Sequence, residues 1–211
     1  EGDGRYAPVR DELRELLGPE GWRAGSRTTL NAHYTDTAYA PMMWQVLADL
    51  GFTGGEVLEP GCGAGTFIAA APAGVHVVGI ELDPTTAAIA SLLHPAKATV
   101  YAESFADTRL PSGSFDAVIG NVPFGRISLY DPHHNPDGLS IHNHFIVKSL
   151  ALLKPGGLMV VLTSRYTLDA KDTTARERMY ALADLVGALR LPTGAHARAA
   201  GTAAVTDLLV L

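Results

Sequence analysis

The stretch Val57-Leu58-Glu59-Pro60-Gly61-Cys62-Gly63-Ala64-Gly65-Thr66 decides the fold that this sequence predicts. Its short apolar run and three alternating glycines indicate a strand that turns sharply into a helix, because a Cβ there would obstruct the turn and an approaching ligand. Glu81 ends the next strand-like run about twenty residues later, where a carboxylate can accept hydrogen bonds from both ribose hydroxyls of a nucleoside cofactor. The stretch therefore predicts a cofactor loop; a tight structural turn is the alternative that the glycines alone leave open.

The acidic residue before the glycines argues against a dinucleotide as the ligand. The dinucleotide fingerprint reads G-x-G-x-x-G, and the N-terminus of its helix faces a pyrophosphate. Here Glu59 precedes the glycines, and a carboxylate at that position repels a pyrophosphate. The same carboxylate suits a ligand that carries an amino group and a sulfonium, so we interpret the loop as a site for a cationic ligand.

Strand-like and helical runs alternate along the rest of the chain. The expected strands are Glu56–Glu59, Val75–Glu81, Thr99–Ala102, Phe115–Gly120, Leu158–Thr163, Leu185–Arg190 and Val205–Leu211. The expected helices are Pro8–Leu17, Ala40–Leu50, Thr66–Ala71, Thr85–Leu93, His142–Leu153 and Thr174–Ala183. Apolar strands that alternate with helices indicate a parallel sheet covered on both faces, and the last two strands have no helix between them. We predict an α/β, doubly wound, mostly parallel seven-stranded sheet with a C-terminal antiparallel pair, preceded by a helical extension over residues 1–30.

The composition describes a folded domain. The 211 residues are 47% hydrophobic and 18% charged, which suits one globular domain, residues 31–211, and excludes a disordered chain. The net charge of −6 provides no global basic surface, so a nucleic-acid partner needs a local patch or a region outside this chain. Cys62 is the single cysteine and the sequence has no secretory signal or membrane-spanning run, so we expect a cytoplasmic protein without a membrane partner. Because the chain begins at Glu1 and ends inside the apolar run Leu208–Leu211, we expect a domain taken from a longer protein.

Three segments carry a resemblance to a known family. They are Glu-Pro-Gly-Cys-Gly-Ala-Gly-Thr-Phe (59–67), Gly-Ile-Glu-Leu-Asp-Pro (79–84) and Asp-Ala-Val-Ile-Gly-Asn-Val-Pro-Phe-Gly (116–125). In this order they resemble the motif series of class I S-adenosylmethionine-dependent adenine-N6 DNA methyltransferases, which carry Asn-Pro-Pro-Phe/Tyr after the fourth strand. The resemblance runs from about Asn31 to the C-terminus, and it extends to the methylase portion of large helicase–methylase proteins. It implies a Rossmann-like class I methyltransferase fold and S-adenosyl-L-methionine as the cofactor.

The resemblance also implies which residues bind this cofactor. Glu59 and the glycines would hold the methionine part, and the segment around Thr35 would close over it. Glu81 would hold the ribose, Leu82 would pack on the adenine ring, and Glu103 would meet the adenine amine. The full expected set is Tyr34, Thr35, Glu59, Pro60, Gly61, Cys62, Gly63, Gly65, Thr66, Phe67, Glu81, Leu82, Glu103, Ser104, Phe105 and Asn121.

The catalytic segment expected from the resemblance is Asn121-Val122-Pro123-Phe124. The exocyclic amine of adenine is a poor nucleophile because its lone pair is delocalised into the ring. Two acceptors on its N–H bonds, the Asn121 carboxamide oxygen and the Val122 carbonyl, would localise that lone pair and aim it at the sulfonium methyl. Phe124 would stack on the extruded base. The family usually has proline where Val122 stands, but a backbone carbonyl is available from either residue, and Pro123 biases Val122 towards an extended conformation.

Arg126 and His196 are the expected substrate contacts. In the family, the loop between the last two strands adds an aromatic to the base pocket, and His196 is the candidate for that place here. Cations after the catalytic segment can supply a local phosphate-binding face, and a solvated surface accounts for most of them equally well. These cations are Arg126, Lys148, Arg165, Lys171, Arg176, Arg178 and Arg198.

Four histidines, His133, His134, His142 and His144, follow the catalytic segment. We expect no metal, because neither pair has the i, i+4 spacing of a zinc motif and transfer from a sulfonium needs none. They are interpreted as loop polarity or substrate contacts. Ser140 is expected to cap the helix that follows, and Cys62 to be a small buried spacer.

The leading hypothesis is a site-specific DNA adenine-N6 methyltransferase that flips its base into the pocket, as one module of a restriction, phage-defence or anti-restriction protein. A recognition or helicase region C-terminal to this chain is an expected partner region. Two alternatives stay open. The same Asn-x-Pro-Phe chemistry can act on an RNA base or on a protein glutamine, and the chain can be a catalytically silent cofactor-binding module of a larger helicase.

Overall fold

The computed structural model describes residues 7–29, 35–195 and 204–211, with the side chains of 24–29 left out. The chain divides into two compact units, Glu1–Ala32 and His33–Leu211, which are described separately. The first contains α1, Ala7–Thr29, whose backbone leaves the helical conformation at Gly18 (φ 64°). The sequence predicts its first half. A second half follows because glycine adopts a positive φ without strain and Pro19 is suited to start a new helical turn.

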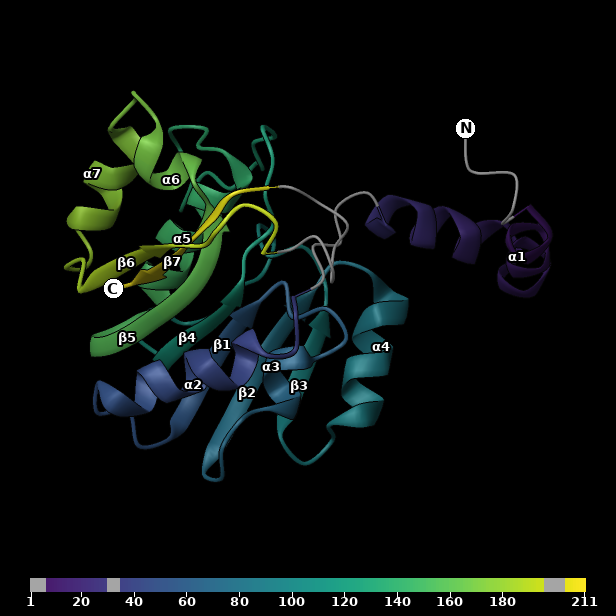
Figure 1. Ribbon diagram of the computed structural model, residues 1–211, viewed down its shortest axis with the longest axis horizontal. Helices are drawn as coiled ribbons and strands as arrows, with labels where there is room; N and C mark the ends of the chain where they lie inside the picture. The colour runs from purple at the N-terminus through teal and green to yellow at the C-terminus, as the bar shows by residue number, and fades with distance from the viewer. Residues whose placement is uncertain (1–6, 30–34, 196–203) are drawn as a thin grey trace. The chain divides into compact units, whose positions relative to one another are not determined.

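In the described part of the second unit, seven strands form one sheet in the order β3-β2-β1-β4-β5-β7-β6 (Figure 1). Their bounds are β1 Gly55–Pro60, β2 Val75–Glu81, β3 Ala98–Ala102, β4 Phe115–Asn121, β5 Leu153–Ser164, β6 Gly187–Arg190 and β7 Thr206–Val210. The first five strands pair in parallel, whereas β7 runs antiparallel to both β5 and β6. The predicted sheet, including its C-terminal antiparallel pair, is confirmed.

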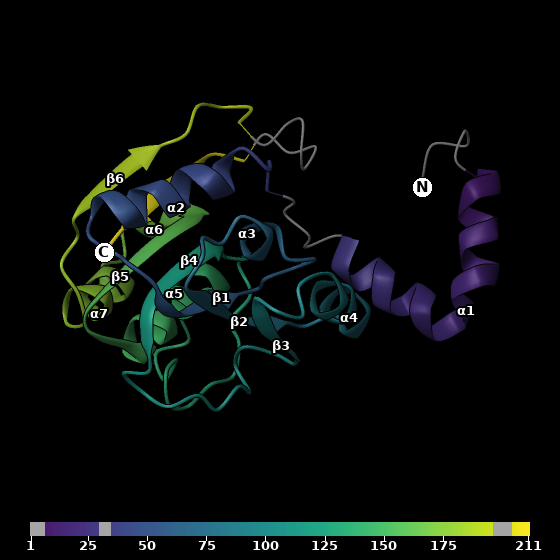
Figure 2. The same ribbon diagram turned by 90° about the horizontal axis from the view of Figure 1, so that it is seen from below.

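Helices cover both faces of the sheet (Figure 2). They are α2 Tyr39–Asp49, α3 Thr66–Ala69, α4 Pro84–Leu93, α5 Ile141–Leu152, α6 Tyr166–Asp169 and α7 Thr174–Tyr180. Because neighbouring residues in a strand point to opposite faces, Val57 belongs to the core cluster on the side of α2 and α3, whereas Leu58 belongs to the cluster on the side of α5 and α7. Helix α4 lies against β2 and β3. The sheet is therefore buried on both sides, as its continuous apolar strands predict.

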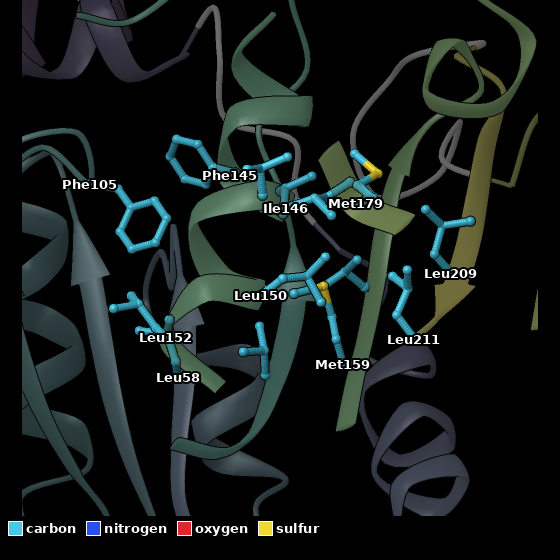
Figure 3. Packing of buried hydrophobic residues seen from close by; sticks show 14 of the residues in the cluster. Leu58, Phe105, Phe145, Ile146, Leu150, Leu152, Met159, Met179, Leu209 and Leu211 are labelled. Atoms are coloured by element: carbon cyan, nitrogen blue, oxygen red, sulfur yellow. The ribbon is translucent and has the colours of Figure 1, made fainter. Parts of the chain in front are cut away.

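The core on the α5 side extends from the sheet to the loop after β3 (Figure 3). The rings of Phe105 and Phe145 lie with their centroids 4.9 Å apart. Met159 and Leu209, from β5 and β7, complete the cluster beneath α5. This packing fixes the loop that leaves β3, and with it the position of Glu103 and Ser104.

In the second unit, most boundaries differ from the sequence prediction by one to three residues, and two differences are larger. Strand β5 begins at Leu153 instead of Leu158, because Lys154–Gly157 form an irregular stretch of the strand where the sequence suggests a break. The pairing shifts there, with Phe115 opposite Leu153 and Ala117 opposite Leu158. The second difference is α6, a single turn after β5 that the sequence analysis does not predict. None of the helices in the described ranges is both long and apolar enough to cross a membrane.

Candidate functional site

The expected site residues gather at the carboxyl ends of neighbouring parallel strands. Strand β1 lies between β2 and β4, so Glu59, Glu81 and Asn121 all stand at the same edge of the sheet. This edge is where open α/β sheets bind ligands, because the chain leaves adjacent strands in different directions and opens a crevice there. The fold therefore brings the cofactor loop and the catalytic segment together.

The glycine loop joins β1 to α3 in a conformation that only glycine adopts readily. Gly61, Gly63 and Gly65 have φ angles of 75°, 54° and 91°. A Cβ on Gly65 would lie 2.7 Å from Cδ2 of His94, so a side chain there would collide with that ring. A Cβ on Gly63 would meet no described atom within 4 Å. The loop is thus closed on the His94 side and open at Gly63, as a surface that receives a ligand must be.

Cys62 fills a space beneath this loop. A Cβ on Gly79 of β2 would lie 2.8 Å from its Sγ, so the thiol occupies room that the glycine leaves. Burial, together with the carboxyls of Glu59 and Glu81, raises the pKa of the Cys62 thiol far above its ordinary value. A thiol that stays protonated is a poor nucleophile, which agrees with its interpretation as a buried spacer.

Glu81 bridges the glycine loop and the start of α4. Its Oε2 accepts a hydrogen bond from the Gly63 amide at 3.0 Å, and its Oε1 accepts one from the Asp83 amide at 2.9 Å. Asp83 in turn caps α4 by accepting from the amide of Thr86 at 2.8 Å. The carboxylate is thereby fixed beside the open glycine, while the adjacent Leu82 side chain is 69% exposed.

Glu59 is the most unusual group of the site. Its side chain is only 2% exposed, and Oε2 has no hydrogen-bond partner among the residues that the structure describes. Burial, reinforced by the nearby Glu81 carboxylate, raises the pKa of Glu59 well above its ordinary value. A buried carboxyl without a donor is costly, and a ligand amino group would supply both the donor and the positive charge.

The catalytic segment begins at the last residue of β4. The Asn121 Nδ2 donates to the hydroxyl of Thr35 at 3.1 Å, which orients the carboxamide so that Oδ1 is its acceptor. The Val122 amide still donates to the Leu162 carbonyl of β5, at 3.0 Å, and the Val122 side chain is fully buried in the core. A Cβ on Gly61 would lie 3.7 Å from Pro123 Cδ. The segment is therefore anchored in the sheet and lies against the cofactor loop.

The phenylalanines of the expected set and of the catalytic segment face the core. Phe67 is 2% exposed and Phe105 is 3% exposed, and Phe124 is half-buried against the same cluster as Phe105. Glu103 and Ser104 are half-buried after the end of β3. Pro60 ends β1 and Thr66 begins α3, so both flank the glycine loop. Tyr34 and His196 lie outside the described residues.

A buried charged cluster, which the sequence patterns do not predict, connects α5 with the loops after β3 and β4. Lys148 of α5 is 1% exposed and donates to Asp131 Oδ2 at 3.0 Å and to the carbonyls of Phe105, Ala106 and Thr108. The interpretation of Lys148 as a phosphate-binding surface cation is wrong, because its ammonium is enclosed by these acceptors. The sequence did contain a signal, since Lys148 shares a helical face with the buried Ile141, Phe145 and Leu152.

Two of the four histidines also differ from their interpretation. His142 and His144 are buried in α5 at 5% and 0% exposure, so the interpretation as loop polarity is wrong for these two. His144 Nε2 lies 3.1 Å from Asp131 Oδ2 and must carry the proton, because a carboxylate is an acceptor. Ser140 does stand at the N-cap of α5, but its hydroxyl pairs with His142 Nε2 instead of a helix amide. Among the described residues, no three metal-ligating side chains come together.

Comparisons with known proteins agree with this geometry. Residues 32–196 match the methyltransferase domain family. Over 210 residues the chain is 30% identical to the "defense against restriction protein B" of Escherichia phage P1, covering 97% of this chain and 9% of that protein. The type II methyltransferases M.TthHB8I of Thermus thermophilus and M.XamI of Xanthomonas campestris pv. amaranthicola are 33% and 28% identical. Those matches cover 51% and 85% of this chain, and 28% and 37% of the two enzymes.

Solved structures support the same fold. A protein from Listeria monocytogenes described as a class I S-adenosylmethionine-dependent methyltransferase superposes with a TM-score of 0.67 at 18% identity. The superposition covers 96% of this chain and 67% of that one. Geranyl diphosphate C-methyltransferase of Streptomyces coelicolor, solved with S-adenosyl-L-homocysteine, has a TM-score of 0.54 at 16% identity and covers 80% and 78%. The predicted Rossmann-like fold class is confirmed, and the predicted cofactor, S-adenosylmethionine, agrees with it.

The chain spans between 9% and 37% of the length of these curated relatives. The family match nevertheless covers most of the chain, and it includes the glycine loop, Glu81 and the catalytic segment. This chain belongs to the methyltransferase domain family.

Proposed function

We propose that this domain transfers the methyl group of S-adenosylmethionine to the N6 amine of adenine in DNA at specific sites. The observation that carries the proposal is the placement of Asn121. Its carboxamide is oriented by Thr35 at the end of β4, in a segment whose Pro123 lies against Gly61. The residue that would accept the amine and the loop that would hold the cofactor are thereby adjacent, which is what direct transfer between them requires.

The residues of the glycine loop suit this cofactor. When bound, S-adenosylmethionine supplies a methyl group on a positively charged sulfur, together with an amino group. Glu59, buried and lacking a donor at Oε2 among the described residues, would bind that amino group. Glu81 is already fixed beside Gly63 and would accept from the ribose hydroxyls. Open space above Gly63 lets the ligand reach the backbone.

The catalytic segment would act by positioning. Asn121 Oδ1 and the Val122 carbonyl would accept the two N–H bonds of the amine and aim its lone pair at the methyl group. The amine nitrogen held in this way would take the methyl group from the sulfonium, which leaves as the neutral thioether, and would then release one proton. Val122 can stand in place of the family's proline because its side chain packs in the core and its amide is held by Leu162, so the carbonyl position is fixed by the sheet.

The relatives favour DNA as the substrate. Two of them are type II methyltransferases, and the third is a phage protein that defends against restriction. Restriction acts on DNA, and modification of DNA bases protects against it. A domain of this kind would work as one module of a longer restriction-related protein, in agreement with the small share of the relatives that it spans.

Labelled cofactor identifies the substrate. The chain is incubated with tritiated S-adenosylmethionine and separate pools of DNA, RNA and protein, and the labelled material is digested to nucleosides or amino acids. We expect label in N6-methyldeoxyadenosine and none with the Asn121→Ala variant. Label in an RNA base or in glutamine would replace the proposed substrate by one of the alternatives. Cofactor binding without transfer to any pool would indicate a catalytically silent module.

A further inference from the structure

Tyr166 presents an exposed aromatic ring beside Arg165, just after the carboxyl end of β5. It begins α6, directly after β5, and is 47% exposed. The Arg165 guanidinium carbon lies 4.9 Å from the ring centroid, and Arg165 Nη2 donates to the phenol oxygen at 3.1 Å. Ring and guanidinium therefore hold each other in place, which reduces the freedom of two side chains that would otherwise be mobile at the surface.

A second arginine, Arg126, follows the catalytic segment in the loop that leaves β4 and acts on the same phenol. The hydrogen bond from Arg165, its charge and, more weakly, the charge and hydrogen bond of Arg126 lower the pKa of the Tyr166 phenol. Arg126 comes two residues after Phe124, so the loops that leave β4 and β5 meet at this tyrosine. The strand register explains the meeting, because β4 and β5 run in parallel with Asn121 opposite Leu162. Arg126, Arg165 and Tyr166 are named here the arginine–tyrosine cluster.

Most of the neighbouring cations already have partners. Arg178 pairs with Asp137, and Arg176 donates to the Thr167 carbonyl. Arg190 pairs with both Asp169 and Asp207.

Within the described parts of the chain, neither Arg126 nor Arg165 forms a salt bridge. Asp169 acts on Arg165 at longer range, but its carboxylate is bonded to Arg190 at 2.8 Å. In a chain with a net charge of −6, two guanidiniums that form no salt bridge with a described residue thus lie near one exposed ring.

This combination of groups matches one ligand chemistry. Proteins grip single nucleic-acid strands by stacking bases on aromatic side chains and binding phosphates with nearby cations. A methyltransferase that extrudes its target base must hold the unpaired nucleotides around it. Ile127, next to Arg126 and 54% exposed, adds an apolar side chain of the kind that contacts unstacked bases.

We propose that the arginine–tyrosine cluster binds the DNA strand that carries the target base, with Tyr166 stacked on a nucleotide beside the target. Arg126 and Arg165 bind the phosphates on either side of that nucleotide. The inference rests on the proposed function and names a contact surface for it that lies outside the expected catalytic and cofactor residues.

The test measures binding of a fluorescent single-stranded oligonucleotide to the full chain by anisotropy at several salt concentrations. Tyr166→Ala should raise the Kd about 5- to 150-fold, the range expected for one lost base stack, while Tyr166→Phe keeps the ring and should stay within about 3-fold of wild type. Arg126→Ala and Arg165→Ala should each reduce the slope of log K against log salt by about 0.7.

Two variants serve as matched controls. Tyr180→Ala removes another exposed tyrosine, at the end of α7, and Lys154→Ala removes one positive charge at the opposite end of β5. Both should bind the oligonucleotide like wild type, and all variants should bind S-adenosylmethionine with unchanged calorimetric affinity.

The possible outcomes distinguish a failure of the proposed binding surface from a failure of the proposed function. If wild type methylates adenine and the variants of the arginine–tyrosine cluster bind and react like the controls, the proposed binding surface is overturned. The proposed function then still stands. Oligonucleotide binding that needs Tyr166 but leads to no methylated adenine would support the surface and overturn the function. A wild-type chain that binds no oligonucleotide would overturn the surface as well.

Discussion

Among the buried carboxyl groups of the described residues, Asp131 and Glu59 have opposite surroundings. Asp131, 2% exposed, is surrounded by donors from Lys148, His144 and the amides of His133 and His134. Glu59, also 2% exposed, has an Oε2 with no donor among the described residues. Burial alone opposes the charge on both groups, so the donors make the difference.

The pKa values of Asp131 and Glu59 shift in opposite directions for this reason. Burial raises the pKa of the Asp131 carboxyl, but the hydrogen bonds from Lys148, the His134 amide and His144 outweigh burial and hold it well below its ordinary value. At Glu59, burial and the charge of Glu81 act together, and the pKa is raised. A buried charge that the fold itself compensates is part of the framework, whereas one that the fold leaves uncompensated marks a place for a ligand.

The largest effect is expected from removing Lys148, which compensates the buried charge of Asp131. Lys148→Met leaves Asp131 buried without its ammonium and three carbonyls without a donor, and should lower the free energy of unfolding by about 3–5 kcal/mol in urea titrations. The double variant Lys148→Met/Asp131→Asn removes both charges and should recover part of that loss. A single variant within 1 kcal/mol of wild type would mean that the cluster does not hold the loops together.

In the catalytic segment, Asn121→Ala should lower the rate of methyl transfer by about 10²–10³-fold, because one positioned group that acts on the reacting amine is removed. Stability and the affinity for S-adenosylmethionine should remain near wild type. The measurements are initial rates with labelled cofactor and calorimetric titration of the same preparation. An equally large loss of cofactor binding would show that Asn121 has been assigned the wrong role.

Glu81→Ala should weaken cofactor binding about 10- to 100-fold through the loss of charge-assisted hydrogen bonds to the ribose. Glu56→Ala is a matched control, because Glu56 is a half-exposed glutamate near the other end of β1 that pairs with His76. Calorimetry on both variants tests the assignment. An unchanged affinity in Glu81→Ala would show that this carboxylate does not bind the cofactor and serves only to accept hydrogen bonds from the Gly63 and Asp83 amides.

The smallest effect concerns pH, and the two carboxyls should respond with opposite sign. The raised pKa of Glu59 favours the folded state at low pH, so its contribution is lost as the pH rises above about 4.5. The lowered pKa of Asp131 favours the folded state above about 3.8, and that contribution is lost on acidification.

Urea unfolding of the cofactor-free chain across this range separates the two contributions. Glu59→Gln should remove the decline on the alkaline side, by on the order of 1 kcal/mol, and should leave the acidic decline in place. Asp131→Asn should do the reverse. A single pH dependence shared by both variants would contradict the contrast between the two groups.

The sequence predicts the surroundings of Glu59 better than the surroundings of Asp131. The glycine loop, Glu81 and the catalytic segment follow from local patterns, because each is a short motif at the end of a strand. Their convergence follows from the topology of a parallel sheet. The Thr35 hydroxyl is an expected cofactor neighbour, but its hydrogen bond to Asn121 becomes visible only in three dimensions.

The cluster around Asp131 could not be read from the sequence in the same way. Lys148 meets carbonyl groups about forty residues away and a carboxylate seventeen residues away, and contacts of this kind leave no local motif. The start of β5 was missed for a different reason. Pro155 and the two glycines after it suggest a break, whereas the strand accommodates them as an irregular stretch at its beginning.

The most direct test of the central claim is calorimetric titration of S-adenosylmethionine into wild type and Glu59→Gln. Glutamine keeps the size of the side chain and removes the charge that would bind the ligand's amino group. We expect the Kd of the variant to rise about 10- to 100-fold, because a charge-assisted hydrogen bond is lost. An unchanged Kd, in a folded variant, would contradict the claim that the buried Glu59 carboxyl is completed by the cofactor.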